Sequence, residues 1–278
     1  MLEKMYDGTN VHFAFNIWDF SSAQAVMDAA KNVGKNVILQ TSTNIYQSLP
    51  QCELRHFVTS YAKRLGINVW LNLDHCRNEE MVRDAVDKGW DSVMFDMSQN
   101  GLSQNIEAIN RLSDYVNAKK HLTYIEAEVG VLQGAEDDIE AIESKIASQA
   151  DIDEFIAKAH FDALAVAFGN AHGNYKTKPQ LHYELVEYAT QKSGKPFVVH
   201  GASGLSKDAV KKLASIDGVR KINISTELKL AACQGYKEAA CKGWLEETGF
   251  QPVRVQQCVN AAVKQKAEEK MLMLEGDR

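Results

Sequence analysis

Three histidines of this sequence follow apolar segments that are rich in β-branched and aromatic residues. His75 ends the segment NVWLNLDHC, His172 lies in GNAHGNYK directly after DALAVAFGN, and His200 ends PFVVHG. Three imidazoles that leave one position open are the ligand set of a catalytic zinc ion. A single histidine at a strand end is more often a hydrogen-bonded structural residue, so the zinc hypothesis requires a fold that brings all three together.

Carboxylates accompany these histidines. Asp74 directly precedes His75, Asp96 lies in the segment DSVMFDMS, and Glu126 and Glu128 lie in LTYIEAEVG. Two ionisable groups side by side at a strand end suit either a surface loop or the opening of an active site. Asp96 and Glu128 are predicted to hold a second cation or to orient the histidines through hydrogen bonds.

Two segments rich in glycine and hydroxyl groups, HGASG and NIST, end the last β-rich runs. Their backbone N–H groups can bind an anionic group without basic side chains, which suits a chain with a net charge of −6. The alternative is that Gly201 and Gly204 form a turn and that Ser203 or Ser206 caps the next helix. From these loops alone, the turn is the better-supported interpretation.

The segment GVLQGAEDDIEAIESK, residues 130–145, is polar, acidic and interrupted by glycine. One interpretation is a solvated loop followed by a surface helix. The other is a mobile lid that carries a carboxylate, Glu136, over the active site and excludes water during the reaction.

Eight β-rich runs alternate with segments of helical period. They cover residues 11–17, 36–42, 68–74, 91–98, 122–130, 162–170, 196–201 and 219–226. Their apolar residues are continuous, as a parallel sheet buried on both faces requires. A single (β/α)8 TIM barrel spanning residues 1–278, with additional C-terminal helices after residue 227, is therefore predicted. A doubly wound sheet is the alternative, but no G-x-G-x-x-G follows the first run.

In such a barrel, the active-site groups come from the carboxyl ends of the strands and the loops that follow them. The first two β-rich runs end near Asn16 and at Ser42. The three histidines come from the ends of three other runs. The predicted fold therefore makes all of these side chains converge at one end of the barrel.

The composition excludes several classes of protein. With 31 Lys and Arg against 37 Asp and Glu, the chain lacks the basic surface that a nucleic-acid-binding protein needs. Five cysteines without C-x-x-C spacing indicate reduced thiols in a cytoplasmic protein. No signal-peptide pattern and no apolar run of roughly 20 residues is present. We expect a cytoplasmic protein without nucleic-acid or membrane partners.

Seven motifs together resemble a known family. In order along the chain they are AFNI, LDHC, SVMFDMS, EAEVG with GAEDD, LAVAFGNAHGNYK, VVHGASGL and KINISTELK. They resemble the class II, metal-dependent ketose-bisphosphate aldolases, with the fructose- and tagatose-bisphosphate branch the most similar, from about Phe13 to Lys229. The resemblance implies a (β/α)8 barrel that forms a homodimer or homotetramer. It also implies zinc-dependent cleavage of a ketose phosphate to dihydroxyacetone phosphate and an aldehyde through a zinc-stabilised enediolate.

The resemblance also implies roles for individual residues. His75, His172 and His200 match the zinc ligands. Asp74 matches the acid/base on the C4 hydroxyl, and Glu136 matches the residue that exchanges a proton with C3. Asp96 and Glu128 match positions that bind an auxiliary metal in part of the family. Residues that match the triose- and phosphate-binding loops, where Na⁺ or K⁺ can also bind, are Gly173, Gly201, Ala202, Ser203, Asn223, Ile224, Ser225, Thr226, Asn16 and Ser42.

The sequence departs from the family pattern at several positions. Asn72 stands where many relatives have histidine, Trp18 stands where a polar residue is common, and Ala135 replaces a second glycine before the loop acid. The basic residue that holds the distal phosphate has no secure match, and Arg254 is the one candidate. A substrate phosphorylated only at its triose end is therefore an alternative to a bisphosphate.

Three other functions remain open. A Schiff-base aldolase on the same fold needs a lysine at a strand end, and Lys221 lies early in its run. A zinc hydrolase or isomerase could use the same histidines without releasing a triose phosphate. A non-catalytic barrel would have no need for the full set of histidines and carboxylates.

Overall fold

The computed structural model of the chain describes residues 4–119, 122–132, 134–136, 139–141, 145–173 and 179–275, with only the backbone for 134–136 and 139–141. Eight parallel strands close into a barrel in the order β1-β10-β9-β8-β5-β4-β3-β2. They are β1 (His12–Asn16), β2 (Val37–Thr41), β3 (Val69–Cys76), β4 (Ser92–Phe95), β5 (Tyr124–Val129), β8 (Ala163–Val166), β9 (Phe197–Val199) and β10 (Val219–Ile224). The predicted (β/α)8 barrel is confirmed.

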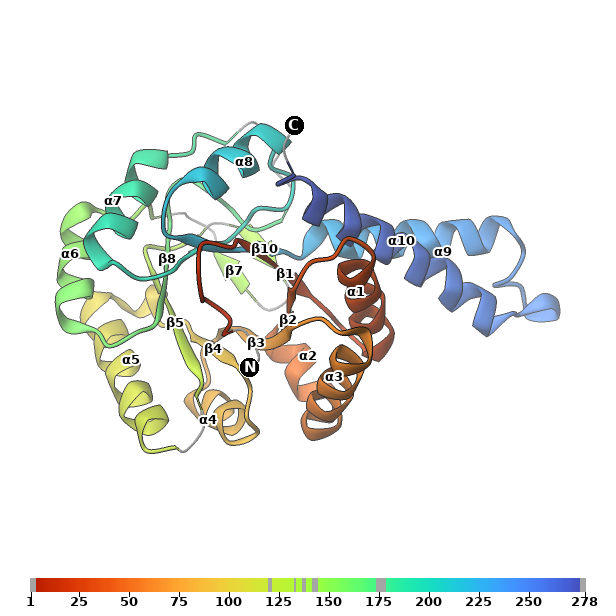
Figure 1. The fold of residues 1–278 in the computed structure, drawn as a ribbon, viewed down its shortest axis with the longest axis horizontal. Coiled ribbons are helices and arrows are strands. Elements are labelled where there is room, and N and C mark those ends of the chain that lie inside the picture. The colour runs from red at the N-terminus through yellow and green to blue at the C-terminus, as the bar shows by residue number, and fades with distance from the viewer. Residues whose placement is uncertain are drawn as a thin grey trace.

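Helices surround the barrel (Figure 1). They are α1 (Phe20–Asn32), α2 (Thr43–Ser48), α3 (Gln51–Leu65), α4 (Glu79–Asp87), α5 (Leu102–Asn117), α6 (Gln149–Lys158), α7 (Tyr183–Ser193) and α8 (Lys207–Ser215), with the short 3₁₀ helices η1 (Ser98–Asn100) and η2 (Glu247–Gly249). The additional C-terminal helices are α9 (Thr226–Cys241) and α10 (Pro252–Leu272). These two pack on each other and project to one side of the barrel as an arm (Figure 1).

The interior of the barrel is layered because alternate residues of each strand point inward. The layer nearest the amino ends of the strands is apolar and contains Met5, Ala14, Ile38 and Trp70. Gln40 and Asn72 follow Ile38 and Trp70 by two residues, and together with Glu126 and Lys221 they are fully buried polar side chains of the strands. Burying polar groups is costly unless they are hydrogen-bonded. We therefore expect these side chains to hold one another in place below the carboxyl ends of the strands.

The segment after β5 differs from the predicted helix. Its described backbone forms a two-stranded antiparallel hairpin of β6 (Gly134–Glu136) and β7 (Ile139–Ala141). A bridge between Val131 and Lys145 closes the base of this hairpin. The expectation of a surface helix here is therefore wrong for these residues, and the side chain of Glu136 lies outside the described part.

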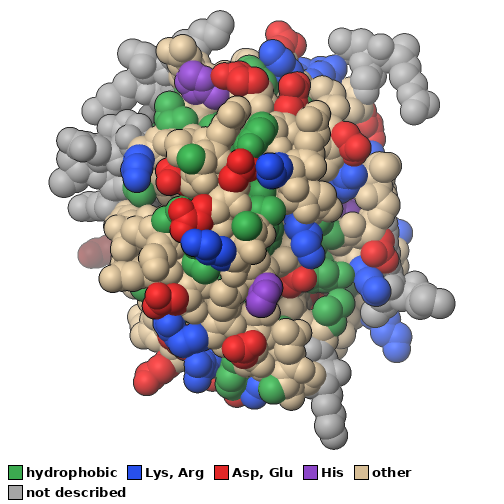
Figure 2. Space-filling view, turned by 90° about the vertical axis from the view of Figure 1, so that its left-hand side faces the viewer, with side chains coloured by type: hydrophobic (Ala, Val, Ile, Leu, Met, Phe, Trp, Pro, Cys, Tyr) green, Lys and Arg blue, Asp and Glu red, His purple; other side chains and the backbone are tan. Residues whose placement is uncertain are grey.

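The surface carries charges of both signs. On the face at the α6 side of the barrel, acidic and basic side chains are interspersed (Figure 2). In the described part of the chain, no helix is both long and apolar enough to cross a membrane.

Candidate metal centre and active site

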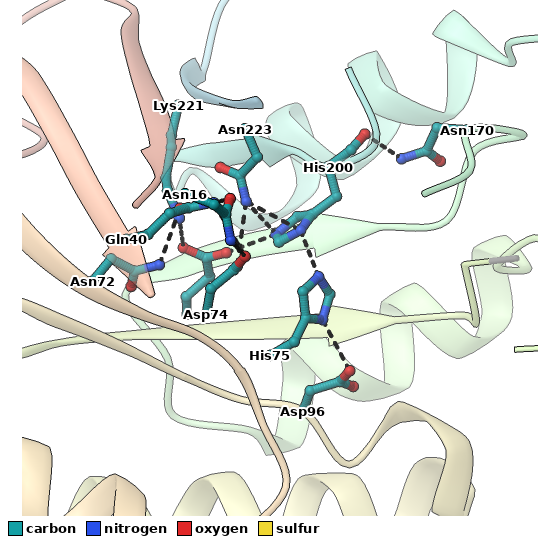
Figure 3. Close-up of polar contacts among 11 residues, drawn as sticks. Asn16, Gln40, Asn72, Asp74, His75, Asp96, Asn170, His200, Lys221 and Asn223 are labelled. Carbon is teal, nitrogen blue, oxygen red and sulfur yellow. Dashed lines mark hydrogen bonds and ion pairs between the residues drawn. The ribbon is translucent and has the colours of Figure 1, made fainter. Parts of the chain in front are cut away.

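The three histidines meet inside the carboxyl-terminal end of the barrel. His75 is the penultimate residue of β3, His200 follows β9 and His172 lies in the loop after β8. Each is at most 6% exposed, and one ring nitrogen from each lies within 4.8 Å of those of the other two. His75 Nε2 and His200 Nδ1 are 2.8 Å apart. One ligand atom of each histidine therefore faces a common position, and Figure 3 shows His75 and His200 pointing toward each other there.

A bulge in β3 explains how Asp74 and His75 act side by side. Neighbouring residues of a regular strand point to opposite faces, yet both of these side chains face the barrel interior (Figure 3). The register of β3 with β4 shifts between Leu73 and Cys76, and His75 has a φ of 46°. A left-handed backbone costs a non-glycine residue about 1–2 kcal/mol. The fold tolerates this cost and brings a carboxylate and an imidazole to the same site.

The outer nitrogens of two histidines are bonded to carboxylates. His75 Nδ1 lies 3.0 Å from Asp96 Oδ2, and His200 Nε2 lies 2.7 Å from Glu126 Oε1. An ionised carboxylate only accepts hydrogen bonds, so these outer nitrogens donate, and the inner nitrogens are the ones left to bind a metal ion. Metal-binding histidines are commonly oriented by carboxylates in this way. The donor set therefore fits a divalent cation such as zinc.

The pKa values of these groups reflect the close packing of charges. Burial lowers the pKa of His75, but Asp74 and the hydrogen bond to Asp96 outweigh it and raise the value to about 10. Burial opposes ionisation of Asp96, but its bonds to His75 and Ser98 hold the pKa well below the usual range. A dication bound at the inner nitrogen competes with the proton of such a histidine.

Glu128 is the other carboxylate predicted to bind a cation or a histidine. It is 2% exposed, and its Oε2 has no hydrogen-bond partner among the described residues. Burial raises the pKa of Glu128 well above its ordinary value, and the charge of Asp96 adds to the shift. Asp96 therefore orients His75, whereas burial and the neighbouring charge favour the neutral form of Glu128.

The carboxylate of Asp74 lies among neutral amides. Asn16 Nδ2 donates to Asp74 Oδ2 at 3.0 Å and Gln40 Nε2 donates to the same oxygen at 3.1 Å. Asn223 Nδ2 lies 3.5 Å from Asp74 Oδ1, and Asn72 Nδ2 donates to Gln40 Oε1 at 3.4 Å. These donors fix the orientation of the carboxylate without an ion pair, which leaves it available as a proton acceptor.

The loops after β9 and β10 touch each other. The backbone N–H of Ser225 donates to Ser203 Oγ at 3.2 Å, whereas Ser206 caps α8 through the N–H of Ala209. Of the two serines considered as caps, one therefore caps the helix and the other joins the loops. Ser225 Oγ and Asn223 Oδ1 are buried and have no hydrogen-bond partner among the described residues. Such oxygens indicate a polar ligand at this place.

The remaining residues predicted to bind the substrate differ in the side-chain or backbone groups that they can present to it. Ser42 Oγ is buried without a described partner at the start of α2, and Thr226 begins α9. The side chains of Ile224 and Ala202 are fully buried in the hydrophobic core, so they offer only backbone groups. Gly173 directly follows His172 in a left-handed conformation.

The departure Trp18 and the candidate phosphate residue Arg254 lie in different parts of the molecule. Trp18 is partly buried and packs against the core between barrel and helices. Arg254 lies at the start of α10 in the arm, with its guanidinium 5.4 Å from the centre of the Trp244 ring. Within this chain, the candidate residue for a distal phosphate therefore belongs to α10, a helix of the arm that projects from the barrel (Figure 1).

Sequence reasoning gave no role to Gln40, Glu126 and Lys221. Lys221 Nζ lies 2.6 Å from Glu126 Oε2, so these two groups and His200 form a continuous buried chain. Period-two alternation contains the signal for Glu126, because Glu126 and Glu128 share one face of β5 and both must point inward. The pairing of Glu126 with Lys221 across the barrel has no such signal in the sequence and is seen only in the structure.

The amino-acid sequence matches the sequence model of the family described as fructose-bisphosphate aldolase class-II over residues 1–277. The chain belongs to the class II fructose-bisphosphate aldolase family. The predicted family is confirmed, and so is the classification as an aldolase, a carbon–carbon lyase. Class II aldolases depend on a divalent metal, which agrees with the donor set of the three histidines.

Relatives within this class II aldolase family carry different substrate names. The sulfofructosephosphate aldolase of Alkalicoccus urumqiensis is 32% identical over 86% of this chain and 83% of its own. The 6-phospho-5-dehydro-2-deoxy-D-gluconate aldolase of Bacillus velezensis is 33% identical over 79% and 77%. The crystal structure of the YdjI aldolase of Escherichia coli K12 has a TM-score of 0.81 at 28% identity, covering 98% of this chain and 94% of that one.

Proposed function

We propose that this aldolase is zinc-dependent and reversibly cleaves a ketose phosphate, a 1-phosphate or 1,6-bisphosphate, to dihydroxyacetone phosphate and an aldehyde. The observation that carries the proposal is the convergence of three buried histidines beside the Asp74 carboxylate. His75, His172 and His200 would hold the zinc ion. When bound, zinc supplies a Lewis acid that stabilises the negative charge developing on the triose half.

Asp74 is proposed to take the proton of the C4 hydroxyl in the cleavage direction. Its carboxylate is oriented by the side-chain amides of Asn16 and Gln40, which both donate to Oδ2. Positioned proton transfer of this kind contributes about 10²–10⁴-fold to a rate. Asn72 supports this arrangement indirectly, because its amide holds Gln40.

The phosphate of the triose half is proposed to lie between the loops 201–203 and 223–226. The backbone N–H groups at the start of α9 and the buried Ser225 hydroxyl supply uncharged donors, and a helix N-terminus favours an anion. A Na⁺ or K⁺ ion bound near these loops would add a positive charge there. Gly173, Ser42 and Asn16 complete the proposed triose site.

Glu136 is proposed to exchange the proton at C3 of the triose. It ends β6 of the hairpin that follows β5. A base carried on such a segment can approach the substrate after binding and exclude water from the carbon acid. Asp96 and Glu128 are proposed to bind an auxiliary metal when one is present.

A Schiff-base mechanism is less well supported. Lys221, the lysine inside the described barrel, is 0% exposed and its ammonium is paired with Glu126 at 2.6 Å. A nucleophilic amine must be unprotonated and free to attack a carbonyl. We further propose that the enzyme is cytoplasmic and forms a homodimer or homotetramer.

The test is a cleavage assay on zinc-loaded protein, with release of dihydroxyacetone phosphate coupled to its NADH-dependent reduction. The substrates are fructose and tagatose 1,6-bisphosphates, sulfofructose phosphate, 6-phospho-5-dehydro-2-deoxygluconate and fructose 1-phosphate. The proposal predicts EDTA-sensitive release from at least one of them.

The variant Asp74→Asn is expected to lower that release by about 10²–10⁴-fold. The same chemical change at the exposed Asp217 is the control and should leave it unchanged. Zinc binding without cleavage of any ketose phosphate would contradict the proposal and favour a hydrolase or isomerase.

A further inference from the structure

A buried ion pair lies directly beneath the proposed zinc position. Lys221 of β10 and Glu126 of β5 are both 0% exposed, and their charged atoms are 2.6 Å apart. Glu126 uses its other oxygen to bind His200 Nε2 at 2.7 Å. The chain of contacts therefore runs from an ammonium through a carboxylate to an imidazole, without exposure to solvent.

The neighbouring strands make room for this pair. β8 and β9 lie between β5 and β10 in the barrel, and their inward residues are the small Ala163 and Ala165 and the medium-sized Val198. Two long charged side chains can therefore meet across the interior. Because burying an ion pair is rarely a net gain in stability, its position against a histidine suggests a role for that histidine.

The directions of the hydrogen bonds fix the histidine tautomer. An ammonium group only donates, so Lys221 holds Glu126 as an acceptor through both carboxylate oxygens. His200 must then donate from Nε2, and the lone pair of Nδ1 points toward His75 Nε2, 2.8 Å away. We propose that Lys221 is a positioning residue that sets, through Glu126, the tautomer of His200 required for zinc binding.

The other carboxylate-bound histidine is arranged differently. Asp96 is held by Ser98, whose N–H and hydroxyl both donate to Oδ1, and the nearest cation, Arg77, is 3.9 Å away and partly exposed. The donors from Ser98 are uncharged, whereas Lys221 places a full positive charge against the carboxylate that binds His200. Of His75 and His200, it is therefore His200 whose tautomer is set by a buried cation.

The variant Glu126→Gln separates this proposal from a general packing role. The ammonium of Lys221 must still face an oxygen, so the introduced carboxamide turns its NH₂ group toward His200. The imidazole must then accept at Nε2 and carry its proton on Nδ1, which removes the zinc-binding lone pair. We expect zinc affinity to fall by about 100-fold, at the upper end of effects for groups that orient metal ligands.

Removing the lysine from that variant should partly restore binding. In the double variant Glu126→Gln, Lys221→Met, the carboxamide is free to turn its oxygen toward His200. Zinc affinity is expected to recover by about tenfold relative to Glu126→Gln alone. Lys270→Met is the matched control, because Lys270 is 1% exposed and paired with Glu227 outside the barrel interior, and it should leave zinc affinity unchanged.

Two measurements on the full-length chain decide the question. Zinc affinity is measured by competition with a chromophoric chelator, and circular dichroism melting checks that each variant is folded. Long-range ¹H–¹⁵N spectra of the zinc-free protein report the histidine tautomers, with the His200 signals assigned from a His200→Gln variant. The proposal predicts an Nε2–H tautomer in the natural sequence and an Nδ1–H tautomer in Glu126→Gln.

The outcomes distinguish this inference from the proposed function on which it rests. If Glu126→Gln keeps the Nε2–H tautomer, or if the double variant binds zinc no better than Glu126→Gln, the inference is wrong. If the double variant fails to fold, the tautomer in Glu126→Gln decides; if Glu126→Gln itself fails to fold, an Nδ1–H tautomer of His200 in the natural sequence would overturn the inference. The NMR measurement needs neither zinc nor substrate, so absence of aldolase activity would leave its answer intact.

Discussion

The substitution Gly201→Ala tests how closely the loops around the metal centre are packed. Gly201 follows His200 with a φ of 63°, and a Cβ added there would lie 2.3 Å from the carbonyl oxygen of Ala171. That residue precedes His172. The added methyl group must therefore push apart the two loops that carry two of the proposed zinc ligands.

The expected size follows from two separate costs. A left-handed conformation costs alanine about 1 kcal/mol, and forcing a methyl group against backbone in a packed site costs about 1–3 kcal/mol more. Gly194→Ala is the matched control, since Gly194 has a φ of 60° at the end of α7 but an added Cβ would meet nothing within 4 Å. Gly194→Ala should therefore lose only the about 1 kcal/mol that the left-handed conformation costs alanine.

Urea unfolding in the presence of EDTA measures both variants. We expect the free energy of unfolding to fall by about 3 kcal/mol in Gly201→Ala and by about 1 kcal/mol in Gly194→Ala. Zinc affinity should fall by more than about tenfold in Gly201→Ala alone. Equal losses of stability in the two variants, together with unchanged zinc affinity, would refute the packing argument.

Three further predictions concern other parts of the molecule. Gly235→Ala should destabilise the arm by about 2 kcal/mol in urea unfolding, because the Cβ would lie 2.6 Å from Val259 Cα; a gain from helix propensity would contradict it. Burial raises the pKa of the Cys76 thiol to about 11, so mass spectrometry should show Cys76 unalkylated at pH 8 until the chain unfolds. Burial raises the pKa of Glu79, but the bonds and charges of Arg111 and Arg83 outweigh burial and lower it. The ionised Glu79 therefore contributes to the free energy of unfolding, by under about 1 kcal/mol. This contribution is present above the pKa of Glu79 in the unfolded chain and is lost as the pH falls. Glu79→Gln should therefore cost stability in urea unfolding at pH 7 and less at pH 4; an equal loss at both would contradict the pairing.

The strand ends of the barrel could be predicted from the sequence because buried parallel strands have continuous apolar runs. Continuous apolar runs marked the strands, and active-site groups lie where such strands end. His75, His172 and His200 were therefore assigned to one place, and the structure brings them within 4.8 Å of one another. Local pattern was sufficient for this part of the site.

Other features depended on geometry that local pattern does not contain. The bulge that turns both Asp74 and His75 inward is a shift in register between β3 and β4, and no residue type in LDHC specifies it. The pairing of Lys221 with Glu126 crosses the barrel between residues 95 positions apart. The hairpin after β5 was missed because its acidic residues favour a helix over a strand by composition.

The central claim is that this protein forms a stabilised carbanion on dihydroxyacetone phosphate with the help of a divalent cation. Deuterium exchange at C3 of this triose phosphate, followed by ¹H NMR in D₂O, tests it without knowledge of the aldehyde. We expect exchange of one C3 hydrogen with zinc-loaded protein, its loss in EDTA and its return with added zinc. No exchange by protein that binds zinc, or exchange that survives EDTA, would contradict the claim.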